Sequence, residues 1–559
     1  MMQTTFDYII AGAGSAGCVL ARRLSDAGHQ VLLLEEGGND ASWILQMPAG
    51  LRSAFKPSSK YNSWFYTSPQ KHLNGRKIQQ PRGRVLGGCS SINGMTWLRG
   101  HAQDYNRWAE QGADGWQWQN CLPYFKKLEN APHVKSPYRG NLGPMHAQVQ
   151  SQLSPLNAAF LEACTQAGHP ISDDVNGYQQ YGASRFEMSV KDGIRNSASF
   201  GYLHQQKAAK AELTNLTVLT HCKVLKVNLQ GTKATGVQVF YKGATHTFSA
   251  QKETLLSSGV FASPQLLMLS GIGPSEQLKS HQIPCVVDLQ GVGENLQDHL
   301  ECHIQIETKQ ALSLNRELQP HRMLWAGMQW FGFKKGVASV NQCHVGAFLN
   351  SDAKVAHPDV QFHFFPVFFD KNWIPVPTTY GYRIGVGPMR PTSRGSVRLQ
   401  SNKASDAMLI NPNYMATQED WQVMRQAMLL GLEVAQQPAF KPYHHKEHTP
   451  GPLIRTGQAM DDFIRDDAAS AYHPCGTCKM GKASDVQAVV NNQLQVLGIE
   501  NLRVVDASVM PSVPSANINA ATIMLAERAS DMILGQPGLP PENLPFHYNY
   551  NATHTKACV

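Results

Sequence analysis

The stretch FDYIIAGAGSAGCVLARRL, residues 6–24, places a glycine-rich turn between an apolar run and an amphipathic segment. A second apolar run, VLLLE at residues 31–35, follows it and ends on an acidic residue. This order predicts a strand, a tight turn, a helix and a second strand, which together form the fingerprint of a dinucleotide-binding unit. The chain is therefore expected to open with a Rossmann-like α/β domain.

Each glycine of the turn has an expected physical role. Gly12 permits the tight turn, Gly14 lets the backbone approach a pyrophosphate, and Gly17 lets the helix pack closely on the strand. The first helical residues offer free N–H groups and a positive dipole end to phosphate. Glu35 is placed to accept hydrogen bonds from a ribose diol. The alternative is an ordinary tight turn with a solvated Glu35.

The composition indicates a globular protein of more than one domain. The chain has 559 residues, of which 42% are hydrophobic and 16% are charged, so it can bury a large core. The net charge is +8, without a long basic run, and nucleic-acid binding is therefore not expected. A mild attraction to anionic lipid headgroups is one interpretation of this charge, and a slightly basic solvated surface is the alternative.

The cysteines indicate a reducing compartment. The odd count of 11, spread from Cys18 to Cys558, is typical of free thiols rather than of a disulfide framework. One CxxC, from Cys475 to Cys478, has no second pair to complete a metal site, so no metal is expected. No apolar stretch reaches membrane-spanning length, and the first strand begins by residue 6. We expect a cytoplasmic protein with peripheral contact at the inner face of the membrane.

Strand-like runs recur along the chain in two patterns. Apolar runs between residues 216 and 256, a strand at 502–506 and a helix at 520–533 extend the Rossmann-like unit. Residues 301–460 instead alternate strand-like runs with an amphipathic helix at 421–436, which predicts an antiparallel sheet with helices behind it. The turn-rich, tryptophan-containing segment 64–118 is expected to form extended loops over a nucleotide, together with a lid.

The expected architecture is therefore an α/β, two-domain (α+β) protein with a discontinuous first domain. The predicted boundaries are 1–155, 195–300 and 470–535 for the nucleotide-binding domain, 156–194 and 301–469 for the substrate-binding domain, and 536–559 for a loosely attached tail.

Further blocks accompany the opening turn. They are GRVLGGCSSING at 83–94, SGVFASPQLLMLSGIG at 258–273, YHPCGTCKMG at 472–481, VDASVMP at 505–511 and NIN at 517–519. Together the blocks resemble the glucose–methanol–choline (GMC) oxidoreductases, FAD enzymes that oxidise alcohols, over nearly the whole chain. Within that family, the likeness is greatest to the bacterial choline dehydrogenases.

The resemblance implies a bound FAD that is not covalently attached. Ile92 stands where covalently flavinylated members carry the linking histidine. The cofactor-binding residues implied by the resemblance and the opening turn are Gly12, Gly14, Ser15, Ala16, Gly17, Glu35, Arg84, Gly87, Gly88, Asn93, Gly94, Val224, Asp506, Ala507 and Asn519.

The resemblance also assigns the catalytic pair. Alcohol oxidation removes a proton from oxygen and a hydride from carbon, and the flavin N5 accepts the hydride. The proton needs a base that titrates near working pH, which is typical of histidine. By resemblance this base is His473, and Asn517 is the partner that stabilises the developing alkoxide.

Three further residues concern the substrate. Glu301 matches the carboxylate that faces the cation in choline-oxidising relatives, the alternative being an ion pair with a lysine or arginine. His363 matches a substrate-pocket histidine, or it is a core histidine of the strand at 359–366. Cys343 stands where a cage aromatic is expected, which disfavours choline. It also matches the cysteine of fatty-acid photodecarboxylases of the family, or it simply fills the core.

These features predict an FAD-dependent primary-alcohol dehydrogenase that oxidises choline to betaine aldehyde. Its electrons are expected to pass to a membrane quinone or another carrier. Three alternatives stay open: an aliphatic or aryl alcohol dehydrogenase or oxidase of the same family, an FAD lyase or photodecarboxylase, and a flavin-binding protein without catalysis. The sequence does not decide the oligomeric state.

Overall fold

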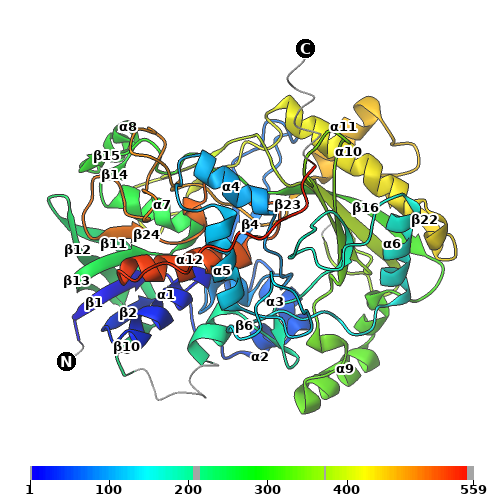
Figure 1. The fold of residues 1–559 in the computed structure, drawn as a ribbon, viewed down its shortest axis with the longest axis horizontal. Helices are drawn as coiled ribbons and strands as arrows, with labels where there is room; N and C mark the ends of the chain where they lie inside the picture. Colours follow the sequence, from blue (N-terminus) through cyan, green and yellow to red (C-terminus); the bar gives the residue numbers. More distant parts are fainter. Residues whose placement is uncertain (1–2, 205–213, 371–372, 550–559) are drawn as a thin grey trace.

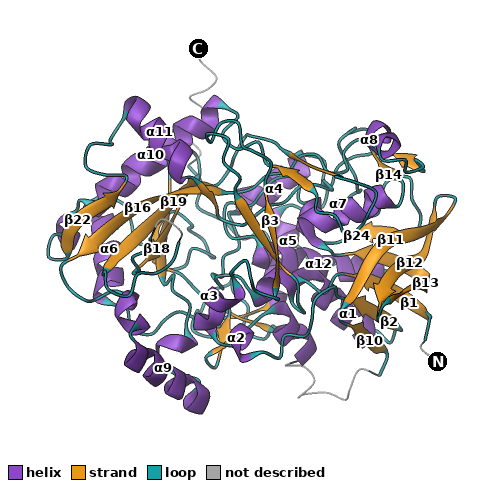
Figure 2. Cartoon of the chain, turned by 180° about the vertical axis from the view of Figure 1, so that it is seen from behind, coloured by secondary structure: helices purple, strands orange, loops and turns teal. Residues whose placement is uncertain are grey.

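The structure is a computed structural model that describes residues 3–204, 214–370 and 373–549. Two seven-stranded sheets lie toward opposite ends of its long axis (Figure 1). The view from behind shows the same separation (Figure 2). The predicted α/β fold, with a Rossmann-like unit and an antiparallel second sheet, is confirmed. The residue boundaries of the two domains stay a prediction.

The first sheet contains the strands that flank the glycine-rich turn. Ile10 and Leu33 point into a core with the helices, while Ile9 and Leu32 point into a second core on the other face. Burial on both faces explains why these strands are apolar without alternation. The strand order is β10 (Leu216–Leu219), β2 (Val31–Leu34), β1 (Thr5–Ala11), β13 (Ala244–Leu256), β12 (Lys233–Tyr241), β11 (Cys222–Gln230), with β24 (Leu502–Val504) beside β13.

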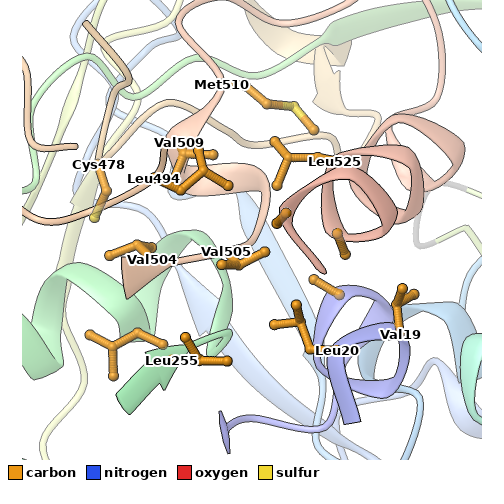
Figure 3. Packing of buried hydrophobic residues seen from close by; sticks show 14 of the residues in the cluster. Val19, Leu20, Leu255, Cys478, Leu494, Val504, Val505, Val509, Met510 and Leu525 are labelled. Carbon is orange, nitrogen blue, oxygen red and sulfur yellow. The ribbon is translucent and has the colours of Figure 1, made fainter. Parts of the chain in front are cut away.

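Two helices from opposite ends of the chain pack together on this sheet. They are α1 (Ser15–Asp26) and α12 (Asn519–Ile533). Figure 3 shows Val19 and Leu20 of α1 below Leu525 of α12, with Val505 and Leu255 to their left in the same core. Arg23 of α1 pairs with Glu527 and Asp531 of α12 at the edge of this contact. The C-terminal helix therefore completes the unit that the N-terminal turn begins.

The second sheet is antiparallel throughout its described ladders. Helix α10 (Gln418–Ala435) lies close behind it, because a Cβ at Gly431 would lie 2.6 Å from Ile304 and 2.8 Å from Val386. Helix α6 (Pro155–Gln166) packs beside α10 in the same core. The order is β22 (His444–Thr449), β16 (Leu300–Thr308), β19 (Gly381–Pro388), β18 (Val360–Phe365), β17 (Val345–Leu349), β7 (Gly182–Arg185), with β23 (Ala469–Ser470) beside β16.

The remaining helices surround the sheets and the space between them. They are α2 (Trp43–Gln46), α3 (Leu51–Ala54), α4 (Ala102–Glu110), α5 (Trp118–Leu128), α7 (Gly259–Leu269), α8 (Ser275–Ser280), α9 (Pro320–Phe333) and α11 (Gly457–Asp467). None of the helices in the described ranges is both long and apolar enough to cross a membrane.

The tryptophan-containing segment 64–118 has two parts. Trp64 and much of residues 79–96 line the large cavity, and their role over a nucleotide stays a prediction. Trp97, Trp108 and Trp116 are instead fully buried in the first core, around α4 and α5. Tryptophan is large and apolar enough to anchor helices even where the surrounding sequence is rich in turns.

The C-terminal tail is not loosely attached as far as residue 549. Leu539 and Leu544 pack against the first core, and Lys126 pairs with Glu542 at 2.5 Å. The backbone N–H of His547 donates to the Tyr178 carbonyl at 2.8 Å. Scattered apolar residues within a proline-rich segment therefore suffice to fix it, while positions 550–559 of the predicted tail lie outside the described residues.

Gly17 is expected to be essential for the packing of α1 on β1. A Cβ at this position would lie 1.9 Å from the Gly12 carbonyl oxygen, so the backbone must shift. We predict that Gly17→Ala lowers the free energy of unfolding by roughly 1–3 kcal/mol, measured by urea unfolding.

The matched control is Gly332→Ala, at a helical position where no atom lies within 4 Å of the new Cβ. Alanine there is expected to leave stability unchanged or to raise it, because alanine favours the helix. Equal effects of the two substitutions would contradict this account of Gly17.

Candidate active site

A single cavity of about 2040 Å³ connects the glycine-rich turn with the second sheet. It is lined by every predicted site residue except Gly17 and Gly87. Those two glycines contact the residues that form the cavity wall. Gly17 packs on Gly12, and the Gly87 N–H donates to the Ala13 carbonyl at 2.8 Å. The structure thus brings the predicted cofactor and substrate residues into one space.

The cofactor end of the cavity is formed by two helix starts and two glycine loops. The hydroxyl of Ser15, at the start of α1, donates to Asn519 Oδ1, at the start of α12, at 2.8 Å. A Cβ at Gly88 would lie 2.7 Å from Gly14 Cα, so the second glycine loop lies directly on the first. Helix N-termini that converge beside bare backbone favour anionic groups, and this end fits a dinucleotide.

Glu35 lies at the end of β2 on the wall of the cavity. Its carboxylate accepts the N–H of Ala13 at 3.1 Å and that of Gly37 at 2.8 Å. Burial raises the pKa of Glu35 to about 7, although these two hydrogen bonds oppose the rise. The backbone therefore holds this carboxylate in place, where its remaining lone pairs can accept a ribose diol.

Two other predicted cofactor residues use their side chains to fix the cavity wall. Asp506 accepts from Gly259 N at 2.9 Å and from Ser263 Oγ at 2.6 Å. Asn93 Oδ1 accepts from the Arg195 guanidinium at 2.9 Å. Of the remaining predicted residues, those that line the same wall are Ala16, Arg84, Gly94, Val224 and Ala507.

At the other end of the cavity, His473 and Asn517 lie in direct contact. Asn517 Nδ2 donates to His473 Nε2 at 2.9 Å. On its other side, His473 Nδ1 lies 3.0 Å from His299 Nδ1, and His299 Nε2 lies 3.0 Å from the Met389 carbonyl oxygen. Four groups therefore form one chain of hydrogen bonds.

This chain determines where the protons sit. A carbonyl only accepts, so His299 Nε2 carries the proton that it donates to Met389. In neutral His299, Nδ1 is then an acceptor, and His473 Nδ1–H donates to it. His473 Nε2 is left as a lone pair that accepts from Asn517 and faces the cavity.

Burial keeps both histidines neutral. It lowers the pKa of His299, and it lowers the pKa of His473 well below the usual value, with His299 and His363 adding to the effect. Asp298 fixes the backbone of this segment, because its carboxylate accepts His473 N–H at 2.8 Å and Ser470 Oγ at 2.5 Å. His473 is therefore presented to the cavity as an unprotonated base.

Glu301 stands at the start of β16, in contact with two histidines. Its Oε2 lies 3.3 Å from His363 Nδ1, and its Oε1 lies 3.6 Å from His303 Nε2. Burial alone would raise the pKa of Glu301, but its contacts with His303 and His363 hold it well below its usual value. Gly385 on the neighbouring strand leaves room for this side chain. Glu301 is therefore a carboxylate inside a largely enclosed site.

His303 is held in turn by a second carboxylate. Its Nδ1 donates to Asp467 at 2.9 Å. Burial would lower the pKa of His303, but Asp467 and Glu301 raise it. His363 bridges the two halves of the site, since its Nε2 lies 3.4 Å from Asn517 Oδ1. Glu301 does not pair with a lysine or arginine among the described ion pairs, so that alternative is wrong.

Cys343 is buried beside these groups and lines the cavity. Burial raises the pKa of its thiol to about 12, so it is a neutral apolar wall rather than a nucleophile. Aromatic rings are present elsewhere on the cavity wall, among them Trp64, Phe365, Phe369, Trp373 and Tyr472.

The sequence interpretation missed the residues behind the site. His299, His303 and Asp298 were not singled out, although the string DHLE at 298–301 contained two of them beside Glu301. Their contacts arise from strand register: β16 pairs with β23, which brings Glu301 opposite Ala469 and close to the His473 segment. Two titratable residues next to a predicted site carboxylate were the available signal.

Comparison with known proteins agrees with this geometry. The N-terminal GMC oxidoreductase profile matches residues 6–301, and the C-terminal profile matches residues 391–526. The chain belongs to the GMC oxidoreductase family.

Two curated relatives align with nearly the whole length of this chain. It is 44% identical to the mitochondrial choline dehydrogenase of Homo sapiens, over 97% of this chain and 92% of that one. It is 45% identical to the oxygen-dependent choline dehydrogenase of Photobacterium profundum, over 97% and 95%. A solved structure of Aspergillus oryzae formate oxidase, described in terms of FAD modification, superposes with a TM-score of 0.88 at 26% identity, over 96% and 99%.

The site predicts a pH dependence of stability. Because the pKa of His299 and of His473 is lowered from 6.5 on folding, the unfolded chain binds more protons just below that pH. Each histidine should make its whole contribution to the free energy of unfolding above pH 6.5. Below that pH the contribution should fall by about 1.4 kcal/mol per pH unit for each histidine.

His299→Gln removes one of these histidines and should flatten the dependence by up to about 1.4 kcal/mol per pH unit, measured by urea unfolding at several pH values. Substitution of the exposed His445 by glutamine is the matched control. An unchanged slope in His299→Gln would show that His299 is not kept neutral by the fold.

Proposed function

We propose that this GMC oxidoreductase is an FAD-dependent dehydrogenase that oxidises choline to betaine aldehyde. The observation that carries the proposal is Glu301, a carboxylate kept ionised in a mostly apolar cavity that it shares with the base His473. The similarity to choline dehydrogenases from two distant organisms supports the same substrate.

Glu301 would recognise the trimethylammonium group. That group has no N–H to donate, so a site for it needs a negative charge and aromatic faces rather than hydrogen-bond acceptors. Glu301 supplies the charge, and rings such as Phe365 and Tyr472 line the same cavity. Cys343 is a small neutral side chain at the position where an aromatic ring was expected. It leaves space there for the ligand and places no charge beside it.

His473 would act as the general base for the hydroxyl group. Its Nε2 lone pair faces the cavity, and its lowered pKa keeps it unprotonated at neutral pH. An alcohol oxygen bound between His473 and Asn517 would replace their direct hydrogen bond: it would donate its proton to Nε2 and accept a hydrogen bond from Nδ2 of the amide. Asn517 cannot take a proton, so His473 is the sole base of the pair.

FAD, when bound, supplies the hydride acceptor at its N5 atom. The start of α1, the start of α12 and the loops containing Gly14 and Gly88 would hold its phosphates, and Glu35 would hold the ribose. Ile92 lines the cavity with an aliphatic side chain, which offers no atom for a covalent link, so we propose non-covalent attachment. We further propose that the electrons pass to a quinone or another carrier, at the inner face of a membrane.

His299 would be a positioning residue for this base. It fixes the tautomer of His473 by accepting its Nδ1–H, and Met389 in turn fixes the tautomer of His299. Without this acceptor, no hydrogen bond would favour the tautomer of His473 that carries its proton on Nδ1, away from the cavity.

Substitution of Glu301 tests the substrate. Glu301→Gln keeps the size of the side chain and removes the charge, so the KM for choline should rise roughly 100-fold. The KM for 3,3-dimethylbutan-1-ol, which has the same shape without charge, should change little. Anaerobic flavin reduction and steady-state turnover with both alcohols measure the two effects.

The control variant is Glu307→Gln on the same strand, where the carboxylate pairs with His448 at 2.8 Å, away from the cavity. If Glu301→Gln changed both substrates equally, the enzyme would be an aliphatic or aryl alcohol dehydrogenase instead. If neither alcohol bleached the flavin of the unmodified enzyme, the alcohol-oxidation proposal itself would fail.

Two substitutions of His299 separate positioning from packing. The amide of His299→Gln can still accept from His473 and donate to Met389, whereas His299→Leu can do neither. We expect His299→Gln to keep kcat/KM within about tenfold and His299→Leu to lose roughly 100-fold or more, with the apparent pKa of the base displaced in the pH profile. Equal losses with unchanged pH profiles would indicate packing alone.

A further inference from the structure

Helix α9 exposes apolar residues where a surface helix normally exposes polar ones. It projects at the lower rim of the molecule, outside both sheets (Figures 1 and 2). Its exposed large apolar residues are Met323, Leu324, Trp325, Met328, Phe331 and Phe333. Soluble proteins rarely expose so many large apolar residues on one helix without a partner.

The helix is anchored with this face outward. Its inner residues Ala326 and Trp330 pack against Met47 and Ala338. Trp330 Nε1 donates to the Gly193 carbonyl at 2.8 Å. The exposed residues are therefore not core residues of a displaced helix, because the core side of α9 is already occupied.

The cations beside this face that lack an acidic partner among the described ion pairs are Lys334 and Lys335, directly after α9. Residues 320–336 contain no aspartate or glutamate, and Arg322 of α9 pairs with Glu317, just before the helix, at 3.2 Å. Lys334 Nζ lies 3.7 Å from the centre of the Trp330 ring, so this cation stays beside the aromatic residues. Arg52, exposed in α3, lines the cavity that α9 also borders.

A second aromatic side chain extends the apolar face. Trp43 of α2 is half exposed, and its ring lies 5.6 Å from that of Phe331. Tryptophan and phenylalanine beside lysine and arginine are typical of helices that lie in the headgroup region of a bilayer.

We propose that α9, together with Trp43, docks the protein on a lipid bilayer that carries anionic headgroups. The apolar face would enter the boundary between headgroups and acyl chains, and the cations would meet the headgroup charge. Met323 and Phe331 of α9 also line the cavity that contains His473. The same helix therefore borders both the cavity and the proposed bilayer contact. This docking does not depend on which alcohol is oxidised.

A second copy of the chain fits the face less well. In a parallel pair of α9 helices, Lys334 and Lys335 of the two copies would lie near one another, and in an antiparallel pair they would lie near Arg322 of the other copy, with no acidic residue within 320–336 to offset them.

Co-sedimentation of the FAD-loaded protein with vesicles tests the docking. The variant Leu324→Ser/Trp325→Ser/Phe333→Ser alters residues that are 66%, 59% and 75% exposed and that do not line the cavity. The matched control is Leu142→Ser/Leu453→Ser/Val486→Ser, with exposures of 93%, 93% and 69% elsewhere on the surface. Flavin absorbance and melting temperature report whether either variant disturbs the fold.

Unmodified protein and control variant should bind phosphatidylcholine vesicles that contain about one third phosphatidylglycerol, more weakly at high salt or on phosphatidylcholine alone. The α9 variant should bind at least roughly tenfold more weakly. Failure of the unmodified protein to bind, or equal binding by all three, would overturn the proposal. A lipid-free dimer of the unmodified protein that the α9 variant dissociates, measured by light scattering, would assign the face to a second copy instead.

Discussion

The contact between the starts of α1 and α12 is the constraint on which the site depends. Ser15 donates to Asn519 there, and Asn517 stands only two residues earlier. The glycine turn at one end of the chain and the His473–Asn517 pair near the other are thereby held at the two ends of one cavity. The apolar packing of α1 on α12 beneath this contact makes the distance between them a property of the core rather than of a flexible loop.

Of two buried titratable side chains in this cavity, one is ionised and the other is neutral. Burial acts against the charged form of both Glu301 and His473. Glu301 is nevertheless ionised because two histidines face its oxygens, one of them held by Asp467. His473 has a neutral histidine and an amide as its nearest partners, and the charge of Glu301 raises its pKa too little to offset burial. The identity of the neighbours thus separates an anionic site from a neutral base within a single cavity.

The sequence was sufficient for the elements that depend on local pattern. The turn at Gly12 to Gly17, the apolar runs of the first sheet and the antiparallel second sheet follow from spacing and periodicity, and motif strings placed His473, Asn517 and Glu301 at one cavity. The partners of these residues were not predictable in the same way. His299 reaches His473 only because β16 pairs with β23, and such register is a tertiary property. The tail was expected to be loosely attached because most of its residues are proline or polar, yet a few apolar residues among them pack against the first core.

That tail ties the two ends of the molecule together. After α12 it contacts the first core, where Glu542 N–H donates to Gln119, and it then reaches the loop between β17 and β18, where Asn549 N–H donates to the Ala356 carbonyl at 2.8 Å. A segment that grips both halves opposes any hinge-like separation of the sheets, since such a motion would break these bonds first. Small movements at the rim of the cavity leave these hydrogen bonds intact, so we expect molecules to enter and leave there.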